Sequence, residues 1–173
     1  MKIDITDVLS IENWTEEQQV QTDLTVFDSR LGEFPITKKA PFTLHLENRE
    51  NKQVLISGET DVTVAVPCDR CLEEVPVSLH LVIDRMIPLK ESEDGEEAAD
   101  TGCLAGSSLD TDRLIYDEIL VNWPMKVLCR EDCKGICKKC GANLNRSACS
   151  CDRTEPDPRM AAIQDIFNQF KEV

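Results

Sequence analysis

Apolar and polar residues alternate strictly along residues 42–83, and this pattern constrains the fold of the 173-residue chain more than any other feature. The apolar positions of three successive runs are Phe42, Leu44, Leu46, Val54, Ile56, Val62, Val64, Val66, Val75, Val77, Leu79, Leu81 and Ile83. A period of two is typical of antiparallel strands with one face on a core and one in water. We therefore predict an antiparallel meander over residues 42–87, in which residues 67–71 form a turn and Gly58 marks a bulge.

Two helical patterns follow the predicted meander. In residues 110–123 a capping Asp110 or Thr111 precedes apolar residues that recur every fourth position, and a proline ends the pattern. Residues 157–171 open with Asp-Pro, a cap followed by a favoured first-turn proline, and predict a C-terminal helix. Between the meander and the first helix, the acidic and glycine-containing residues 89–109 predict a mobile loop.

Together these patterns predict a single α+β domain that spans residues 1–173. Its antiparallel β-sheet meander is expected to be covered by the two helices, with a small C-terminal zinc-binding segment over residues 129–151. The first forty residues are compatible with two arrangements: they complete the sheet, or they wrap around it.

Eight of the nine cysteines fall in closely spaced pairs, which is typical of metal ligands in a reducing compartment. Six of them lie within twenty-three residues, as Cys129, Cys133, Cys137, Cys140, Cys149 and Cys151. Two cysteines separated by two residues hold a zinc ion from one tight turn, and Gly141 supplies the backbone freedom that such a turn needs. We predict that Cys137, Cys140, Cys149 and Cys151 bind one zinc ion.

The spacing of the other cysteines leaves several assignments open. Either Cys129 or Cys133 could replace one of the last two ligands of that site. Together with Cys68 and Cys71 they could instead form a second four-thiolate site, whereas the simpler alternative is that Cys68 and Cys71 are reduced thiols at a turn. A redox pair is disfavoured, because it requires a helix start and a strand pattern follows here. Cys103 is left over.

Charge limits the classes of partner. The net charge of -14 opposes direct binding of nucleic acid by the chain as a whole and favours basic proteins. The cysteine-rich segment differs, because Lys134, Lys138, Lys139 and Arg146 make it locally basic. The N-terminus lacks the apolar core of a secretory signal, and no apolar run is long enough to span a membrane, so we expect a cytoplasmic protein without a membrane partner.

Nothing in the sequence favours catalysis. The residues contain no phosphate-binding glycine loop, nucleophile elbow or metalloprotease motif. His45 and His80 lie on the polar faces of their predicted strands, where a solvated histidine is the expected reading. We predict that the protein is not an enzyme.

Four motifs carry a resemblance to a known family: Cys68-Asp-Arg-Cys71-Leu72, Pro124-Met-Lys, Cys129-Arg-Glu-Asp-Cys133-Lys-Gly and Asp157-Pro-Arg159. They resemble the YceD family of bacteria and plastids. The resemblance implies a role in accumulation of the large-subunit (23S) ribosomal RNA, and it implies a basic ribosomal protein of the large subunit, or a pre-ribosomal particle, as partner. Many relatives have proline where this chain has Lys138, and some branches lack the C-terminal cysteines, which implies that the metal segment is accessory.

The acidic charge and the resemblance together suggest an acidic adaptor that holds a basic ribosomal protein and reaches ribosomal RNA indirectly. Two alternatives remain beside it. The first is a zinc-ribbon protein that binds RNA directly through its locally basic segment. The second is a thiol or zinc-handling protein whose cysteines exchange metal with a partner.

Overall fold

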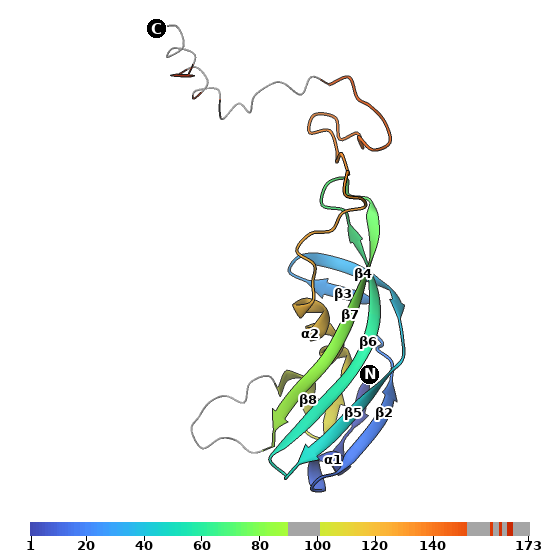
Figure 1. Cartoon of the computed structure of the whole chain (residues 1–173), viewed down its shortest axis with the longest axis vertical. Coiled ribbons are helices and arrows are strands. Elements are labelled where there is room, and N and C mark those ends of the chain that lie inside the picture. Colours follow the sequence, from blue (N-terminus) through green and yellow to red (C-terminus); the bar gives the residue numbers. More distant parts are fainter. Residues whose placement is uncertain (90–100, 152–159, 161–162, 164–165, 168–173) are drawn as a thin grey trace.

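A computed structural model describes residues 1–89, 101–151, 160, 163, 166 and 167 (Figure 1). The elements are β1 (Lys2–Asp4), α1 (Thr6–Ser10), β2 (Thr15–Val20), β3 (Val26–Ser29), β4 (Gly32–Lys39), β5 (Phe42–Arg49), β6 (Gln53–Pro67), β7 (Glu74–Pro88), η1 (Thr101–Cys103), β8 (Leu104–Ala105), β9 (Ser108–Asp110) and α2 (Thr111–Val121). Antiparallel sheet dominates this part of the chain, as the alternating pattern predicts.

A six-stranded antiparallel sheet is built around β6. On one side β6 pairs with β7 over the full length of both strands. On its other side it pairs first with β5 and then with β4, because the strand is too long for one neighbour. Residues 15–39 therefore complete the sheet, because β2 pairs with β5 and the β3–β4 hairpin joins β6. Strand β1 instead belongs to a separate three-stranded sheet with β9 and β8.

The predicted bulge at Gly58 is wrong. Gly58 pairs in regular register with Leu44 of β5 and Ile83 of β7. A Cβ atom at this position would lie 2.9 Å from the carbonyl oxygen of Thr43 and 3.2 Å from the side chain of Leu44. Glycine is needed here because the neighbouring strand approaches closely, which is the second common reason for a glycine inside a strand. The register shift lies instead in the pairing of β4 with β6, between Ile36 and Lys38.

Helix α2 confirms the helix predicted after the loop and packs against β7. Its N-cap is Asp110, whose carboxylate accepts hydrogen bonds from the amides of Asp112 and Arg113. The buried residues of the helix are Thr111, Leu114, Ile115, Glu118 and Ile119. Beyond the helix, Trp123 stacks on Phe27 with ring centroids 5.0 Å apart, and it lies 4.8 Å from Phe34. The apolar stripe of α2 and these aromatic rings close one face of the sheet.

Two other predictions meet the structure only in part. Of the loop predicted over residues 89–109, residues 90–100 lie outside the described part of the chain. The prediction is wrong for residues 101–109, because η1, β8 and β9 follow one another there and β9 pairs with β1. Cys103 and Leu109 are buried in the core and hold this segment against it. The prediction missed this because the acidic residues just before the segment favour a loop. The predicted helix 157–171 falls almost wholly outside the described residues, so the α-helices of the described part of the chain are α2 and the short α1. No helix in the described part of the chain is long and apolar enough to cross a membrane.

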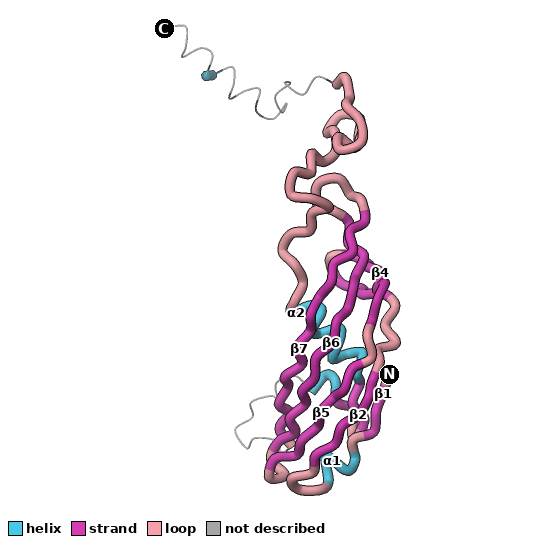
Figure 2. The backbone as a smooth tube through the Cα atoms, turned by 45° about the vertical axis from the view of Figure 1, so that its right-hand side comes forward, coloured by secondary structure: helices cyan, strands magenta, loops and turns pink. Residues whose placement is uncertain are grey.

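The β6–β7 hairpin extends past the rest of the sheet and carries the turn at residues 68–73 (Figures 1 and 2). After α2, the chain runs back toward this tip as a loop that reaches residue 151 (Figure 2). Eight cysteines lie in these two stretches, so the hairpin brings distant parts of the sequence to one end of the molecule.

Candidate metal centres

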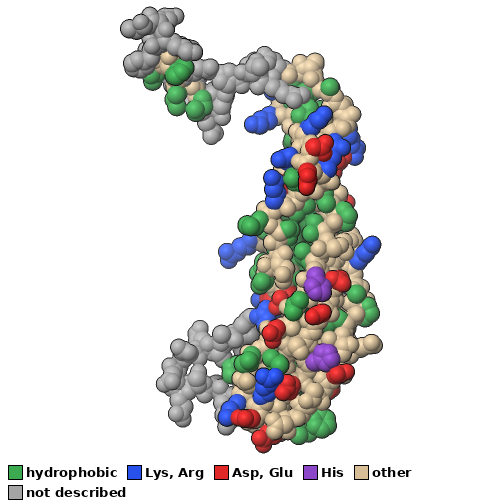
Figure 3. Space-filling view, in the orientation of Figure 1, with side chains coloured by type: hydrophobic (Ala, Val, Ile, Leu, Met, Phe, Trp, Pro, Cys, Tyr) green, Lys and Arg blue, Asp and Glu red, His purple; other side chains and the backbone are tan. Residues whose placement is uncertain are grey.

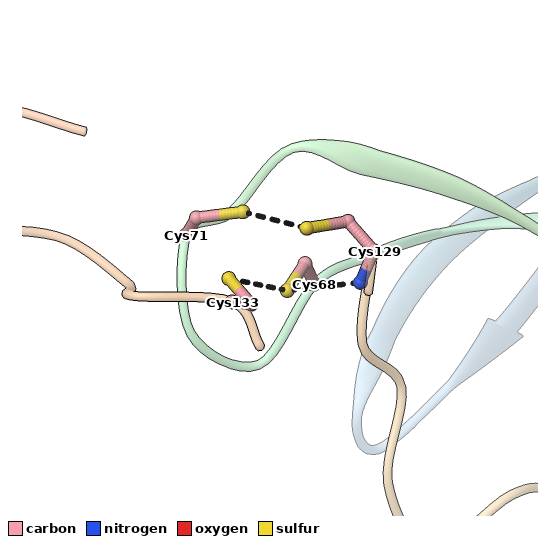
Figure 4. Close-up of side chains that lie close together, drawn as sticks. All are labelled: Cys68, Cys71, Cys129 and Cys133. Carbon is pink, nitrogen blue, oxygen red and sulfur yellow. Dashed lines mark hydrogen bonds between the residues drawn. The ribbon is translucent and has the colours of Figure 1, made fainter. Parts of the chain in front are cut away.

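Four cysteines from two distant segments converge at the hairpin tip, and we call this group the inner centre: Cys68, Cys71, Cys129 and Cys133 (Figure 4). The first two lie in the turn after β6, and the other two lie in the loop that follows α2. The sulfurs of Cys68 and Cys133 are 3.8 Å apart, and those of Cys71 and Cys129 are 3.5 Å apart. Three of the four side chains, those of Cys68, Cys71 and Cys133, are buried. The structure thus unites the two pairs whose proximity the sequence left open.

The distances fit a tetrahedral thiolate site. Zinc binds thiolate sulfur at ~2.3 Å, so two ligands at the corners of a regular tetrahedron are ~3.8 Å apart. All four ligand atoms of the inner centre lie within 4.8 Å of one another. A disulfide requires ~2.05 Å, and all of these cysteines are free. The inner centre could therefore hold one metal ion of the kind that soft sulfur ligands suit, such as Zn²⁺.

Backbone and side-chain hydrogen bonds lock the two segments together. The amide of Asp69 donates to the carbonyl of Val127 at 2.9 Å, and the carboxylate of Asp69 accepts from the amide of Val127 at 2.7 Å. Arg70 donates to the carbonyl of Cys133 at 2.9 Å. The amide of Cys129 points at the sulfur of Cys68 at 3.4 Å. The central residues of the Cys-x-x-Cys turn thus hold the second pair of cysteines in place.

The outer centre is the second group of four: Cys137, Cys140, Cys149 and Cys151. Its ligand atoms also lie within 4.8 Å of one another, so it too could hold one metal ion. Cys137 is buried, whereas Cys140 is exposed and the other two are half-buried. This centre unites the four cysteines predicted as zinc ligands, without Cys129 or Cys133 in the set.

The two Cys-x-x-Cys turns share one backbone geometry. In the outer turn, Gly141 has φ +73° and its amide donates to the carbonyl of Cys137 at 2.8 Å. In the inner turn, Leu72 occupies the equivalent place with φ +63°, and its amide donates to the carbonyl of Cys68 at 2.9 Å. The positive φ predicted for Gly141 is confirmed. Leu72 adopts the same conformation at a steric cost that glycine avoids.

The thiols of each centre differ sharply in acidity. Burial opposes ionisation of Cys68, but three backbone amides outweigh it and lower the pKa of this thiol to about 6. Burial and the neighbouring sulfurs raise the pKa of Cys129 to about 12. In the outer centre, backbone amides lower the pKa of Cys137 to about 6, whereas the sulfur of Cys140 and burial raise the pKa of Cys151 to about 12. A divalent cation would remove this mutual repulsion and allow four thiolates in each centre.

The two histidines and Cys103 lie outside both centres. His45 and His80 are exposed on the sheet, 3.1 Å from a carboxylate oxygen of Glu17 and 3.0 Å from one of Asp61, and neither lies in a centre. Cys103 is buried in the hydrophobic core. Sequence reasoning did not identify Asp69 as a clamp. The position of Asp69 between Cys68 and Cys71 could have suggested such a role. Its partner, the amide of Val127, is brought close only by the tertiary fold.

The family model described as "Large ribosomal RNA subunit accumulation protein YceD" matches residues 56–167 of this chain. The chain belongs to the YceD family. The matched region begins within β6 and includes all eight cysteines of the inner and outer centres. The suspected family is thereby confirmed, and its match covers the residues that build both candidate sites.

Three curated relatives show how far the similarity to YceD-type proteins extends. The chain is 25% identical over 152 residues to the "Large ribosomal RNA subunit accumulation protein YCED homolog 1, chloroplastic" of Arabidopsis thaliana, covering 72% of this chain and 47% of the plant protein. It is 26% identical over 108 residues to an uncharacterized protein of Mycobacterium leprae, covering 61% and 50% of the two chains. It is 24% identical over 124 residues to the uncharacterized protein YlbN of Bacillus subtilis, covering 71% of this chain and 72% of YlbN.

The chain spans about half the length of the plant and mycobacterial relatives it matches. No solved structure matches it.

Proposed function

We propose that this protein supports accumulation of the large-subunit ribosomal RNA without catalysis, as an acidic adaptor that holds a basic ribosomal protein. Membership of the YceD family is the observation that carries the ribosomal role. The adaptor role rests on the surface of the protein and goes beyond what the family name states. We place its action in the cytoplasm, because paired cysteines persist unbridged in a reducing compartment.

The solvent face of the sheet supports an acidic docking surface. Its carboxylates include Glu17, Glu47, Glu59, Asp61 and Asp84, and they share this face with both histidines. Figure 3 shows acidic side chains around the two histidines on the part of the body formed by β5, β6 and β7. An open face with an excess of carboxylates steers a basic protein toward it and repels phosphate.

Strand β7 offers a way for an extended partner to add to this surface. Among the described residues, no strand pairs with β7 on the side away from β6. Residues 77–87 lie between Pro76 and the terminal Pro88 of β7, and this stretch contains no proline, so it retains every backbone donor. A partner segment in extended form can add to such an edge through main-chain hydrogen bonds. We propose that a basic segment of the ribosomal protein binds along β7, beside Asp61 and Asp84.

Capture of purified basic large-subunit ribosomal proteins tests the adaptor. Replacement of Glu59, Asp61 and Asp84 by lysine should weaken capture about tenfold or more at low salt, because attraction becomes repulsion. The matched control carries the same three charge changes on exposed carboxylates outside the six-stranded sheet, at Asp7, Glu12 and Glu131. Capture of naked 23S ribosomal RNA without any protein partner would overturn the adaptor proposal, as would an equal loss in the control.

Direct binding of RNA is the second candidate, and one observation favours it. Residues 124–151 hold six basic side chains against two acidic ones, whereas the chain as a whole is acidic. Lysine and arginine side chains gather toward the end that carries the cysteines (Figure 3). Arg146 is held by Glu73 at 2.5 Å, so Lys134 and Lys138 are better probes of RNA binding. Their replacement by glutamine should weaken RNA binding and flatten its salt dependence if this candidate is correct.

Exchange of zinc with a partner is the third candidate. This role requires metal that leaves the folded protein readily. Cys140 of the outer centre is exposed, so a chelator or a partner could reach the metal there. Retention of metal under mild chelation until the protein unfolds would exclude this role.

A further inference from the structure

One side chain connects the two candidate centres. Asn145 lies in the outer loop, between Cys140 and Cys149 in sequence. Its side-chain amide donates to the sulfur of Cys133, an inner-centre cysteine, at 3.2 Å. Its side-chain oxygen accepts from the amide of Lys134 at 2.8 Å. A residue held by the outer loop therefore binds a candidate ligand of the inner centre directly.

A second connection runs through the neighbouring residue. The guanidinium of Arg146 pairs with a carboxylate oxygen of Glu73 at 2.5 Å. The other carboxylate oxygen of Glu73 lies 3.7 Å from the sulfur of Cys71. Arg146 thus reaches the second turn ligand of the inner centre through one intervening carboxylate.

The backbone between the centres is also bridged. The amide of Leu144 donates to the carbonyl of Gly135 at 2.9 Å, and Ile136 and Asn143 form an isolated β-bridge. The amide of Ile136 donates in turn to the carbonyl of Arg70 at 3.1 Å. Gly135 has φ +75°, and a Cβ atom there would lie 3.0 Å from this carbonyl. The loop that carries Asn145 therefore packs on the turn of the inner centre itself.

We propose that the two centres form one coupled unit, in which metal in the outer centre fixes Asn145 against Cys133 and so slows the loss of metal from the inner centre. This inference rests on the metal assignment of both centres and is independent of the ribosomal role. An N–H donor to a ligand sulfur stabilises the thiolate and orients it, and loss of such a contact typically costs ten- to a hundredfold in metal affinity. The outer metal acts because it closes the loop that positions Asn145.

Metal-release kinetics of the full-length protein test the coupling. Zinc-loaded protein is mixed with a chromogenic chelator, and the number of released ions and their rates are measured. The wild type should release two zinc ions. The variant Cys149→Ser/Cys151→Ser should retain only the inner ion and release it about tenfold faster than the wild type does.

Variants at position 145 separate coupling through the hydrogen bond to sulfur from coupling through packing. Asn145→Asp keeps an oxygen acceptor for the amide of Lys134 but removes the N–H donor to Cys133. Both Asn145→Asp and Asn145→Ala keep the outer cysteines, and both should release the inner ion about tenfold faster than the wild type does. Ser147→Ala, at an exposed position of the same loop, is the matched control and should behave as the wild type.

Three results would overturn the proposal: release of fewer than two ions from the wild type, inner-ion release that is unchanged in the outer-centre variant, or wild-type release from Asn145→Asp. If Asn145→Ala fails to fold, Asn145→Asp and the outer-centre variant still decide the outcome. None of these results bears on capture of ribosomal proteins, so failure of this inference and failure of the proposed function are distinguishable.

Discussion

The inner and outer centres contain the same Cys-x-x-Cys turn, but they connect parts of the chain that differ greatly in sequence separation. In the outer centre all four cysteines lie between residues 137 and 151, so a metal there would close only a short loop. In the inner centre the contacting sulfurs are 58 and 65 residues apart in sequence. A bound metal would cross-link the hairpin tip to the segment after α2, and cross-links across longer loops restrict the unfolded chain more. Similar cysteine spacing therefore does not reveal whether the ligands of a site come from one short segment or from two segments that are distant in sequence.

Replacement of one ligand in each centre should give the largest difference between the inner and outer centres. Cys71→Ser should detach residues 127–133 from the hairpin tip, so that amides bonded across this junction, such as those of Asp69 and Cys129, exchange near the rate of an unfolded chain. Cys140→Ser should leave this junction protected and expose only the outer loop. Hydrogen exchange followed by mass spectrometry gives the measurement. Equal loss of protection at Asp69 in both variants would contradict the distinction.

The pH dependence of the metal-free protein should reveal the paired acidities of each centre. Cys68 and Cys137 have pKa values lowered from 9.0 to about 6, so they stabilise the fold above pH 9 and lose this contribution as pH falls through about 6. Cys129 and Cys151 have pKa values raised to about 12, so they oppose folding as pH rises from 9 toward 12. The thiol contribution to stability should therefore peak near pH 9.

Thermal unfolding provides the measurement of that peak. The difference in melting temperature between the metal-free wild type and a variant with all eight clustered cysteines replaced by serine isolates the thiol contribution. This difference should be larger at pH 9 than at either pH 6 or pH 11. A difference that stays constant over this range would argue against the assigned acidities.

Asp69 tests how the inner centre is attached. Asp69→Ala removes the carboxylate that accepts from the amide of Val127 at 2.7 Å, and it should destabilise the junction by about 1–3 kcal/mol. Asp132→Ala serves as a control, because Asp132 lies in the same loop and pairs at 3.4 Å with an exposed arginine. Chemical denaturation of the zinc-loaded proteins measures both effects. A loss in the control as large as that in Asp69→Ala would remove the special role of Asp69.

The smallest expected effect concerns the two turns themselves. Leu72→Gly should stabilise the inner turn by at most about 1 kcal/mol, because it relieves a positive φ at a side chain that is 64% exposed. Gly141→Leu should destabilise the outer turn by a similar amount, since it introduces the same strain. Metal-competition titrations of each centre would compare the two changes. A weaker inner site in Leu72→Gly would indicate that the leucine side chain has a packing role.

Several features of the fold could be predicted because they depend on local pattern. The meander strands and α2 follow from period-two and helical spacing, and the cap at Asp110 follows from a side chain beside its own helix. Gly58 was assigned to a bulge because a glycine in a strand has more than one explanation, and the approach of Thr43 is visible only in the folded sheet. The strands at residues 104–110 were missed because two-residue and three-residue strands leave almost no periodic signal.

The ligand cysteines, the strand and helix patterns, the acidic charge and the resemblance to the YceD family can all be read from the amino-acid sequence. Local spacing also sufficed to group Cys137, Cys140, Cys149 and Cys151, because these residues are close along the chain. Three contacts are visible only in the folded protein: Cys68 and Cys71 meet Cys129 and Cys133, Asp69 holds the two segments together, and Asn145 joins the two centres. The physical reason is that proximity across about sixty residues depends on where the long β6–β7 hairpin ends in space, which no local pattern specifies.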